Sequence, residues 1–186
     1  MDNFANVSTA LQIMKEQRGL CIAGKHITVS TCGLADRICE FADAGLKVNL
    51  AISLHAAADE LRTRLMKINK TYPIKSVMEA VDYYLEKTRR KVSLEYIMLK
   101  DVNDSADQAR QLAELIGDRK QLINVNLIPY NPIEEHPQYK RSDHEVTLAF
   151  YDVLKKHGLN CNIRLEKGRD IEAACGQLRS KQMKSK

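Results

Sequence analysis

Five short segments of this sequence alternate apolar with polar residues, and amphipathic helical segments lie between them. The alternating segments cover residues 27–30, 48–54, 92–99, 123–128 and 160–164. Alternation with a period of two predicts β-strands. Apolar residues recur at helical spacing near 4–14, over 33–44, after Pro73, over 105–116 and over 142–157. Strands separated by helices predict right-handed βαβ units, and therefore a parallel sheet in an α/β fold.

The polar positions within the strands constrain the fold further. Parallel strands covered by helices on both faces are apolar throughout, yet every strand here has one polar face. The polar positions are Thr28, Ser30, Asn49, Ser53, Ser93, Glu95, Asn124, Asn126, Asn160 and Asn162. Burying such a face is costly unless a polar ligand or water fills the space beside it. We therefore expect a partial (β/α) barrel of about five mainly parallel strands with a hydrophilic lumen, in preference to an open sheet with one face in solvent.

Composition narrows the class of protein. The chain has 186 residues, of which 44% are hydrophobic and 28% charged, as in one globular domain. It has no run of 18 apolar residues and no basic, apolar leader, so we predict a cytoplasmic protein without a membrane span or signal peptide. Five cysteines, an odd number without a CxxC pair, argue against a disulfide framework and against a self-contained zinc site.

The positive charge is concentrated at the C-terminus. Residues 164–186 carry seven Lys and Arg against three Asp and Glu, which accounts for most of the net charge of +5. Such a segment is either a contact for a nucleic-acid backbone or a solvated terminus.

The common catalytic motifs are absent. The sequence contains no GxGxxG, GxxxxGK[ST], HExxH or GxSxG. These absences argue against a nucleotide-binding loop, a zincin-type metalloprotease and a serine hydrolase. An aldol-type or sugar-phosphate barrel enzyme would need a Schiff-base lysine at an inward strand position, and none of the polar strand positions is a lysine.

A set of less common motifs resembles the radical-SAM adenosine methyltransferases of RNA, the RlmN and Cfr family. These motifs are Ala51–Ala56 (AISLHA), Asp59–Arg62 (DELR), Ile68–Lys70 (INK), Glu95–Leu99 (EYIML), Val102–Asp104 (VND), Val125–Pro132 (VNLIPYNP) and Asp170–Leu178 (DIEAACGQL). They occur in the family's order and spacing over essentially the whole chain. The resemblance implies a radical-SAM partial barrel.

Two motifs of the same family are missing. The CxxxCxxC loop that holds the 4Fe-4S cluster and the Gly-Glu-Pro motif are both absent, and Cys32 and Cys39 are too widely spaced to replace the loop. We therefore expect the C-terminal half of a longer enzyme, truncated at its N-terminal side and inactive by itself. Residues 1–165 would form the C-terminal portion of the barrel, and residues 166–186 the catalytic-cysteine loop and basic tail.

The resemblance also implies cofactors and cofactor-binding residues. S-adenosylmethionine would lie across the strand ends, at positions that correspond to Ser30, Ser53, Leu54, His55 and Asn131. Hydroxyl, imidazole and amide groups can bind ribose hydroxyls and the methionine zwitterion. Taken singly, Ser30 could instead cap the next helix, His55 could be a satisfied loop histidine, and Asn131 could form an Asx-turn. The 4Fe-4S cluster belongs to the full-length enzyme, so we expect no metal ligands in this chain.

Cys175 matches the family's methyl-carrying cysteine. The receiving adenine carbon is not nucleophilic, so the resemblance implies a methylcysteine intermediate, for which Lys167 and Arg169 would favour the thiolate. A small buried residue is the alternative for an isolated cysteine.

The implied partners are RNA, namely 23S rRNA with tRNA left open, and an electron donor such as flavodoxin for the full-length enzyme. Carbon 2 of adenine is favoured over carbon 8. The alternative function is a non-catalytic module that binds RNA or S-adenosylmethionine. An unpaired edge at residues 27–30 also predicts self-association.

Overall fold

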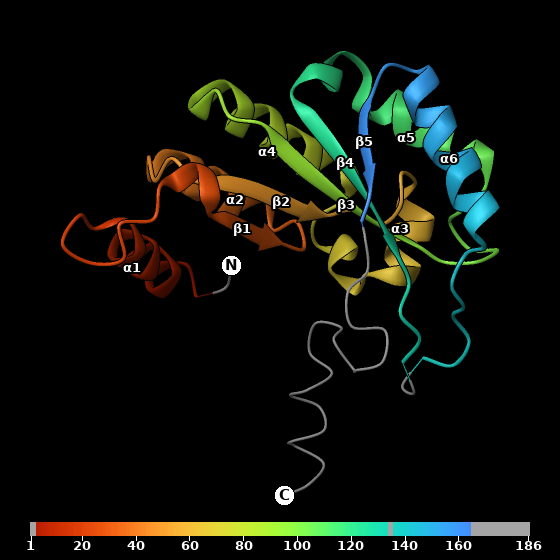
Figure 1. Cartoon of the computed structure of the whole chain (residues 1–186), viewed down its shortest axis with the longest axis horizontal. Coiled ribbons are helices and arrows are strands. Elements are labelled where there is room, and N and C mark those ends of the chain that lie inside the picture. The colour runs from red at the N-terminus through yellow and green to blue at the C-terminus, as the bar shows by residue number, and fades with distance from the viewer. Residues whose placement is uncertain (1–2, 134–135, 165–186) are drawn as a thin grey trace, which may run out of the picture.

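The computed structural model describes residues 3–133 and 136–164. Its strands are β1 (Thr28–Thr31), β2 (Asn49–Ser53), β3 (Val92–Met98), β4 (Ile123–Pro129) and β5 (Asn160–Ile163) (Figure 1). Its α-helices are α1 (Phe4–Lys15), α2 (Ala35–Asp43), α3 (Asp59–Leu65), α4 (Ile74–Thr88), α5 (Ala106–Ile116) and α6 (His144–Lys156). Three short 3-10 helices are η1 (Gly24–His26), η2 (Lys67–Lys70) and η3 (Gly117–Gln121). The five predicted strands are confirmed, each within about two residues of its predicted ends.

The strands form one sheet in the order in which they occur in the sequence. The order is β1-β2-β3-β4-β5, and every neighbouring pair is parallel. Right-handed crossovers between consecutive neighbours place their helices on the same face of a sheet. Figure 1 shows α4, α5 and α6 together on one side of the strands. The opposite face of the sheet is therefore left open in the described part of the chain.

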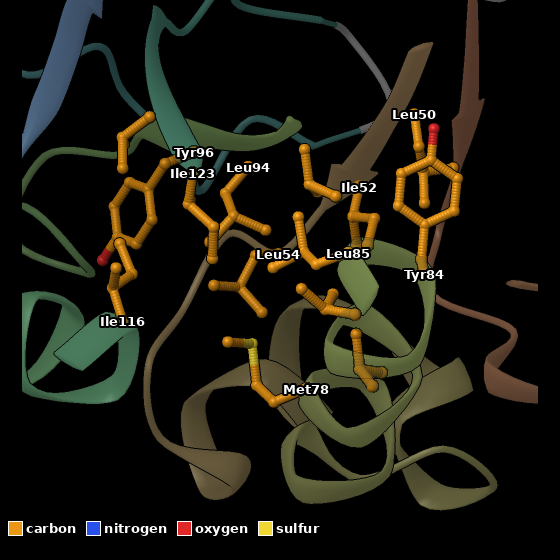
Figure 2. Close-up of a cluster of buried hydrophobic side chains, with 14 of the residues drawn as sticks. Leu50, Ile52, Leu54, Met78, Tyr84, Leu85, Leu94, Tyr96, Ile116 and Ile123 are labelled. Atoms are coloured by element: carbon orange, nitrogen blue, oxygen red, sulfur yellow. The ribbon is translucent and has the colours of Figure 1, made fainter. Parts of the chain in front are cut away.

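The hydrophobic core lies between the sheet and this helix layer. Leu50, Ile52 and Leu54 of the β2 segment are fully buried there with Leu94 of β3 (Figure 2). Tyr84 of α4 joins the same core, and its hydroxyl donates a hydrogen bond to the carbonyl of Val48 at 2.9 Å. The apolar half of each alternating strand is thus used for packing against the helices.

The polar half of each strand lies on the open face. Strand register aligns Ser30, Ala51, Ser93, Asn124 and Asn160 in one row across all five strands. The next row contains Ser53, Glu95, Asn126 and Asn162. Ala51 is buried, and the other members of both rows are half-buried or exposed. The predicted polar face is confirmed, and within the described residues β1 and β5 are the edges of an open sheet.

One local prediction is wrong. The spacing of Ser142 and Glu145 is that of a capping box and predicts Ser142 as the N-cap of the last helix, but the N-cap of α6 is Asp143, and no side chain caps the first turn. The Asp143 carboxylate instead accepts a hydrogen bond from Lys100 Nζ at 2.7 Å. Two adjacent residues can both serve as N-caps, and the sequence pattern selected the wrong one.

Candidate cofactor site at the strand ends

The carboxyl ends of the strands bring most of the predicted site residues to one edge of the sheet. Ser53 is the last residue of β2 and is half-buried on the open face. Ser30 is exposed on the same face of β1, where it pairs with Ala51, one row away from Ser53. Asn131 is half-buried in the loop that follows β4. Parallel strands are about 4.8 Å apart, so Ser30 and Ser53 are near neighbours, whereas β3 separates Asn131 from the β2 end.

Hydrogen bonds fix the backbone of the segment 53–55. The amides of Leu54 and His55 both donate to the carbonyl of Glu95, at 3.0 and 3.3 Å. His55 has φ of +62°, in the left-handed region that is costly for a residue other than glycine. Its carbonyl accepts a hydrogen bond from Nδ2 of the buried Asn103 at 2.9 Å. The chain therefore turns sharply at the end of β2, and β3 with its following loop holds the turn in place.

The protonation state of His55 follows from its contacts. The backbone amide of Ile97 donates to Nδ1 of His55 at 3.2 Å, and an amide can only donate, so Nδ1 carries no proton. Burial, and then the positive charge of Arg62, lower the pKa of His55 to about 4. At neutral pH the ring is uncharged and its proton lies on Nε2. Nδ1 of His55 thus already accepts a hydrogen bond, and Nε2 has a proton that it can donate.

Leu54 differs from its neighbours, because its side chain faces away from the open face. The side chain is fully buried in the core (Figure 2), its amide is bonded to Glu95, and its carbonyl accepts from Arg62 Nε at 3.2 Å. Only the backbone of Leu54 could therefore contact a cofactor on the open face.

Ser30 does not cap the following helix. The N-cap of α2 is Leu34, whose extended backbone follows Gly33 at φ of +96°. The alternative reading of Ser30 as a cap is therefore wrong, and its hydroxyl remains on the open face.

Glu95 was not among the predicted site residues. It lies in the same row as Ser53, and Asn126 Nδ2 donates to its Oε1 at 2.8 Å. The signal available in the sequence was a single carboxylate among Ser, Thr and Asn at the polar strand positions. A hydroxyl, a carboxylate and an amide side by side suit a ligand that has hydroxyl groups and a positive charge. The open face therefore fits S-adenosylmethionine by its chemistry.

Two hollows lie elsewhere on the molecule. One of about 390 Å³ lies between α4 and the end of α5, and another of about 360 Å³ lies at the start of α6. Neither is lined by Ser30, Ser53, His55 or Asn131. The candidate site is therefore the polar face and its strand ends.

The described cysteines do not fit an iron-sulfur cluster. Cys21 is exposed, Cys32 and Cys39 are half-buried, and Cys161 is buried, where burial raises its thiol pKa to about 12. Within residues 3–133 and 136–164, no three His, Cys, Asp or Glu side chains lie close enough together to hold a metal ion. Cys175, Lys167 and Arg169 lie outside the described residues, as does the whole segment 166–186. No described helix is long and apolar enough to cross a membrane.

Comparison with known proteins identifies the family. Residues 6–116, from α1 to the end of α5, match the radical SAM superfamily. The chain belongs to this superfamily. A radical SAM methyltransferase from Sphaerobacter thermophilus superposes with a TM-score of 0.89 and 38% identity, covering 95% of this chain and 51% of that one. A domain of pyruvate-formate lyase-activating enzyme from Bacteroides vulgatus shares the fold, with a TM-score of 0.62 and 17% identity over 87% of this chain and 93% of that one. The predicted α/β fold of radical-SAM type with five parallel strands is confirmed, and in the described residues these strands form one open sheet.

Curated relatives extend over the whole chain. These relatives are named "Probable dual-specificity RNA methyltransferase RlmN". The one from Shouchella clausii is 60% identical to this chain, over 100% of this chain and 52% of its own length. The relative from Enterococcus faecalis is also 60% identical, over 98% of this chain and 51% of its own length. The chain spans about half the length of these relatives. Membership of the radical SAM superfamily implies S-adenosylmethionine and a 4Fe-4S cluster as cofactors.

Proposed function

We propose that this chain supplies S-adenosylmethionine-binding strands and the methyl-carrying cysteine of an enzyme that methylates adenosine in RNA. The substrate is 23S rRNA, methylated at carbon 2 of adenine, with tRNA as the second substrate that the relatives' name "dual-specificity" suggests. The observation that carries the proposal is the 60% identity to these relatives over the whole chain. Further support comes from the polar strand ends, where Ser53 and the neutral His55 lie two residues apart in the sequence.

Four of the predicted residues would hold the cofactor. Ser30, Ser53 and Asn131 offer hydroxyl and amide groups, and His55 offers its Nε2 proton without adding a positive charge. A neutral donor suits this place, because the cofactor already carries a cationic sulfonium and a protonated amine. When bound, S-adenosylmethionine supplies the methyl group.

Cys175 is the proposed carrier of that methyl group. The thiolate is the nucleophilic form of cysteine, and Lys167 and Arg169 are close to Cys175 in sequence and would favour it. The basic residues of the segment 164–186 would contact RNA phosphates, which position an RNA without specifying the base. An electron donor such as flavodoxin is a further proposed partner of the complete enzyme.

The test uses the natural gene that encodes this sequence, expressed in a bacterial strain whose 23S rRNA lacks 2-methyladenosine. The gene should restore the modification, measured by mass spectrometry of the digested rRNA. Cys175→Ala should abolish it, whereas the matched control Cys21→Ala should not, because Cys21 is exposed and is not part of the motif.

Three results would count against this assignment. Full activity of the Cys175→Ala enzyme would exclude methyl transfer through this sulfur. The appearance of 8-methyladenosine would move the reaction to carbon 8. Binding of S-adenosylmethionine without any methylation by the folded wild-type product would favour the non-catalytic module.

A further inference from the structure

Arg62 of α3 carries a guanidinium that is fully buried, and among the described residues no carboxylate forms a hydrogen bond or ion pair with it. A guanidinium has five N–H groups, and here each has an acceptor. Nε donates to Leu54 O at 3.2 Å, Nη1 to Asn69 Oδ1 at 2.6 Å and Tyr72 O at 3.1 Å, and Nη2 to Cys32 O at 2.8 Å and Ser53 O at 3.4 Å. Four of the five acceptors are backbone carbonyls, and none carries a charge.

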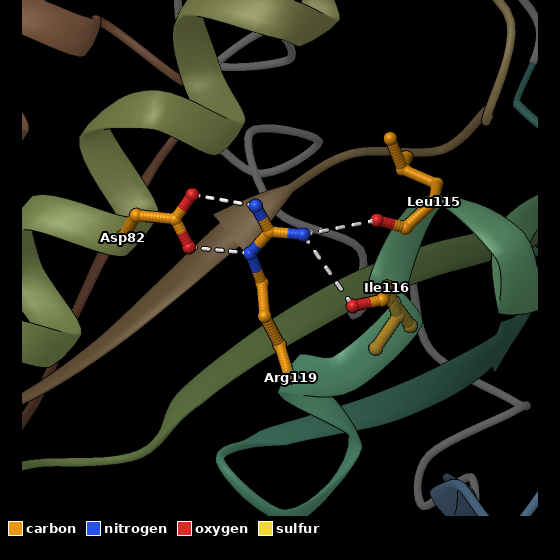
Figure 3. A network of polar contacts seen from close by, with 4 residues as sticks. All are labelled: Asp82, Leu115, Ile116 and Arg119. Atoms are coloured by element: carbon orange, nitrogen blue, oxygen red, sulfur yellow. Dashed lines mark hydrogen bonds and ion pairs between the residues drawn. The ribbon is translucent and has the colours of Figure 1, made fainter.

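Arg119 shows the more usual arrangement in the same protein. Its guanidinium forms a two-point ion pair with the Asp82 carboxylate and also reaches the carbonyls of Leu115 and Ile116 (Figure 3). Its side chain is 31% exposed, so its charge is both paired and partly hydrated. Burying a cation without a carboxylate partner is costly. Burial of the Arg62 guanidinium therefore costs free energy that the ion pair and partial hydration of Arg119 avoid.

The carbonyls bound by Arg62 belong to the candidate site. Cys32 directly follows β1, and Ser53 and Leu54 lie at the end of β2. One planar fork thus joins the ends of two neighbouring strands. These strands carry Ser30 and the segment 53–55, which contain four of the five predicted cofactor residues.

Gly33 and three side chains of the segment 59–69 also help to hold this guanidinium in place. Gly33 has φ of +96°, and a Cβ placed there would lie 2.9 Å from Arg62 Nη2. Asn69 is held in turn, because its Nδ2 donates to Asp59 Oδ1 and to Thr63 Oγ1, both at 2.9 Å. The same Asp59 oxygen accepts the amide of Ile74 at the start of α4, at 2.8 Å. The DELR and INK motifs therefore form one hydrogen-bonded network with the buried Arg62 at its centre.

We propose that Arg62 is a positioning residue, which fixes the ends of β1 and β2 at the separation that S-adenosylmethionine binding requires. It does not touch the cofactor itself, because all five of its N–H groups are already used. The identity of the ligand rests on the proposed function, whereas the fixing of the strand ends rests on geometry alone. The charge has a second effect nearby, since it helps to keep His55 neutral.

The test compares three variants of the purified enzyme that the natural gene encodes with a matched control. Arg62→Lys keeps the charge but has three donors on a flexible stem instead of a planar fork. Arg62→Met removes charge and donors, and Asn69→Ala removes one acceptor. Arg119→Met is the control, since it deletes an arginine that also binds backbone carbonyls but lies away from the strand ends.

Two readouts separate positioning from general stability. NMR hydrogen exchange of the Leu54 and His55 amides reports on the turn at the end of β2, and calorimetry reports on S-adenosylmethionine binding. In Arg62→Lys and Asn69→Ala we expect both amides to exchange about tenfold faster and the cofactor to bind about tenfold more weakly, a difference of about 1.4 kcal/mol. Amides in the middle of β3 and the control variant should show wild-type values.

Several outcomes would overturn the proposal. Wild-type exchange and binding in both Arg62→Lys and Asn69→Ala would show that the strand ends do not depend on this network. Faster exchange throughout the sheet, or unfolding of all three variants, would make Arg62 an ordinary part of the fold. If the folded wild-type enzyme fails to bind S-adenosylmethionine, the proposed function is wrong, while exchange at Leu54 and His55 still decides the role of Arg62.

Discussion

Acidification should destabilise this protein through one side chain, His55. Its pKa in the folded chain is about 4, because of burial and then the charge of Arg62, against 6.5 for an ordinary histidine. As the pH falls, the unfolded chain therefore takes up the proton first. The stabilisation that depends on neutral His55 is complete above pH 6.5 and is lost as the pH falls from there toward 4. Between pH 7.5 and pH 5 these two pKa values correspond to a loss of about 2 kcal/mol.

The assay is urea unfolding followed by circular dichroism at both pH values, for the wild type and for His55→Asn. Asparagine tolerates the left-handed backbone of this position, offers an oxygen to the Ile97 amide, and does not titrate. The wild type should lose about 2 kcal/mol more than the variant over this pH interval. The other histidines are exposed and are present in both proteins, so their effects cancel. Equal losses in the two proteins would refute the assignment of a neutral His55 whose pKa is lowered by the fold.

Four further results are expected. Tyr84→Phe should lower the free energy of unfolding by about 1 to 2 kcal/mol, measured in urea, because the buried carbonyl of Val48 loses its donor. Gly33→Ala should lower the melting temperature more than Gly45→Ala, because both positions have positive φ but only at Gly33 would the new Cβ also meet a buried guanidinium. The purified chain should contain no stoichiometric iron after anaerobic reconstitution and should not methylate RNA, as colorimetric iron and methyl-transfer assays would show. Light scattering should detect a dimer or larger species, because β1 pairs only with β2 among the described strands.

The strands and their polar face could be predicted because the alternation of apolar and polar residues follows the alternation of buried and open positions along each strand. Each strand packs one side against helices and leaves the other open, so apolar and polar residues alternate along β3 and β4 as burial does. A chain with helices on both faces would have lost this signal. The fold class therefore followed from local patterns, and the order of the motifs supplied the family.

The roles of Arg62 and Glu95 could not be predicted from local sequence patterns. Charged residues are rarely buried, so nothing in a local pattern marks Arg62 as the centre of a network. Its acceptors come from Cys32, Ser53, Leu54, Asn69 and Tyr72, which only the folded chain brings together. Glu95 likewise became a candidate site residue only when the structure placed it beside Ser53 of β2 and Asn126 of β4. The predictions for Cys175 and the C-terminal segment lie outside the described residues and remain predictions.

The strand order has a consequence for how the chain acquires its structure. Each strand pairs with the one that precedes it in the sequence, as Asn49 with Thr28 and Asn160 with Asn124, so no strand has to wait for a partner made later. Synthesis proceeds from the N-terminus, and ordered domains can form while the rest of the chain is still being made. This topology allows β2 to β5 to be added to the sheet in the order of their synthesis, with the exposed edge of each strand available to pair with the next.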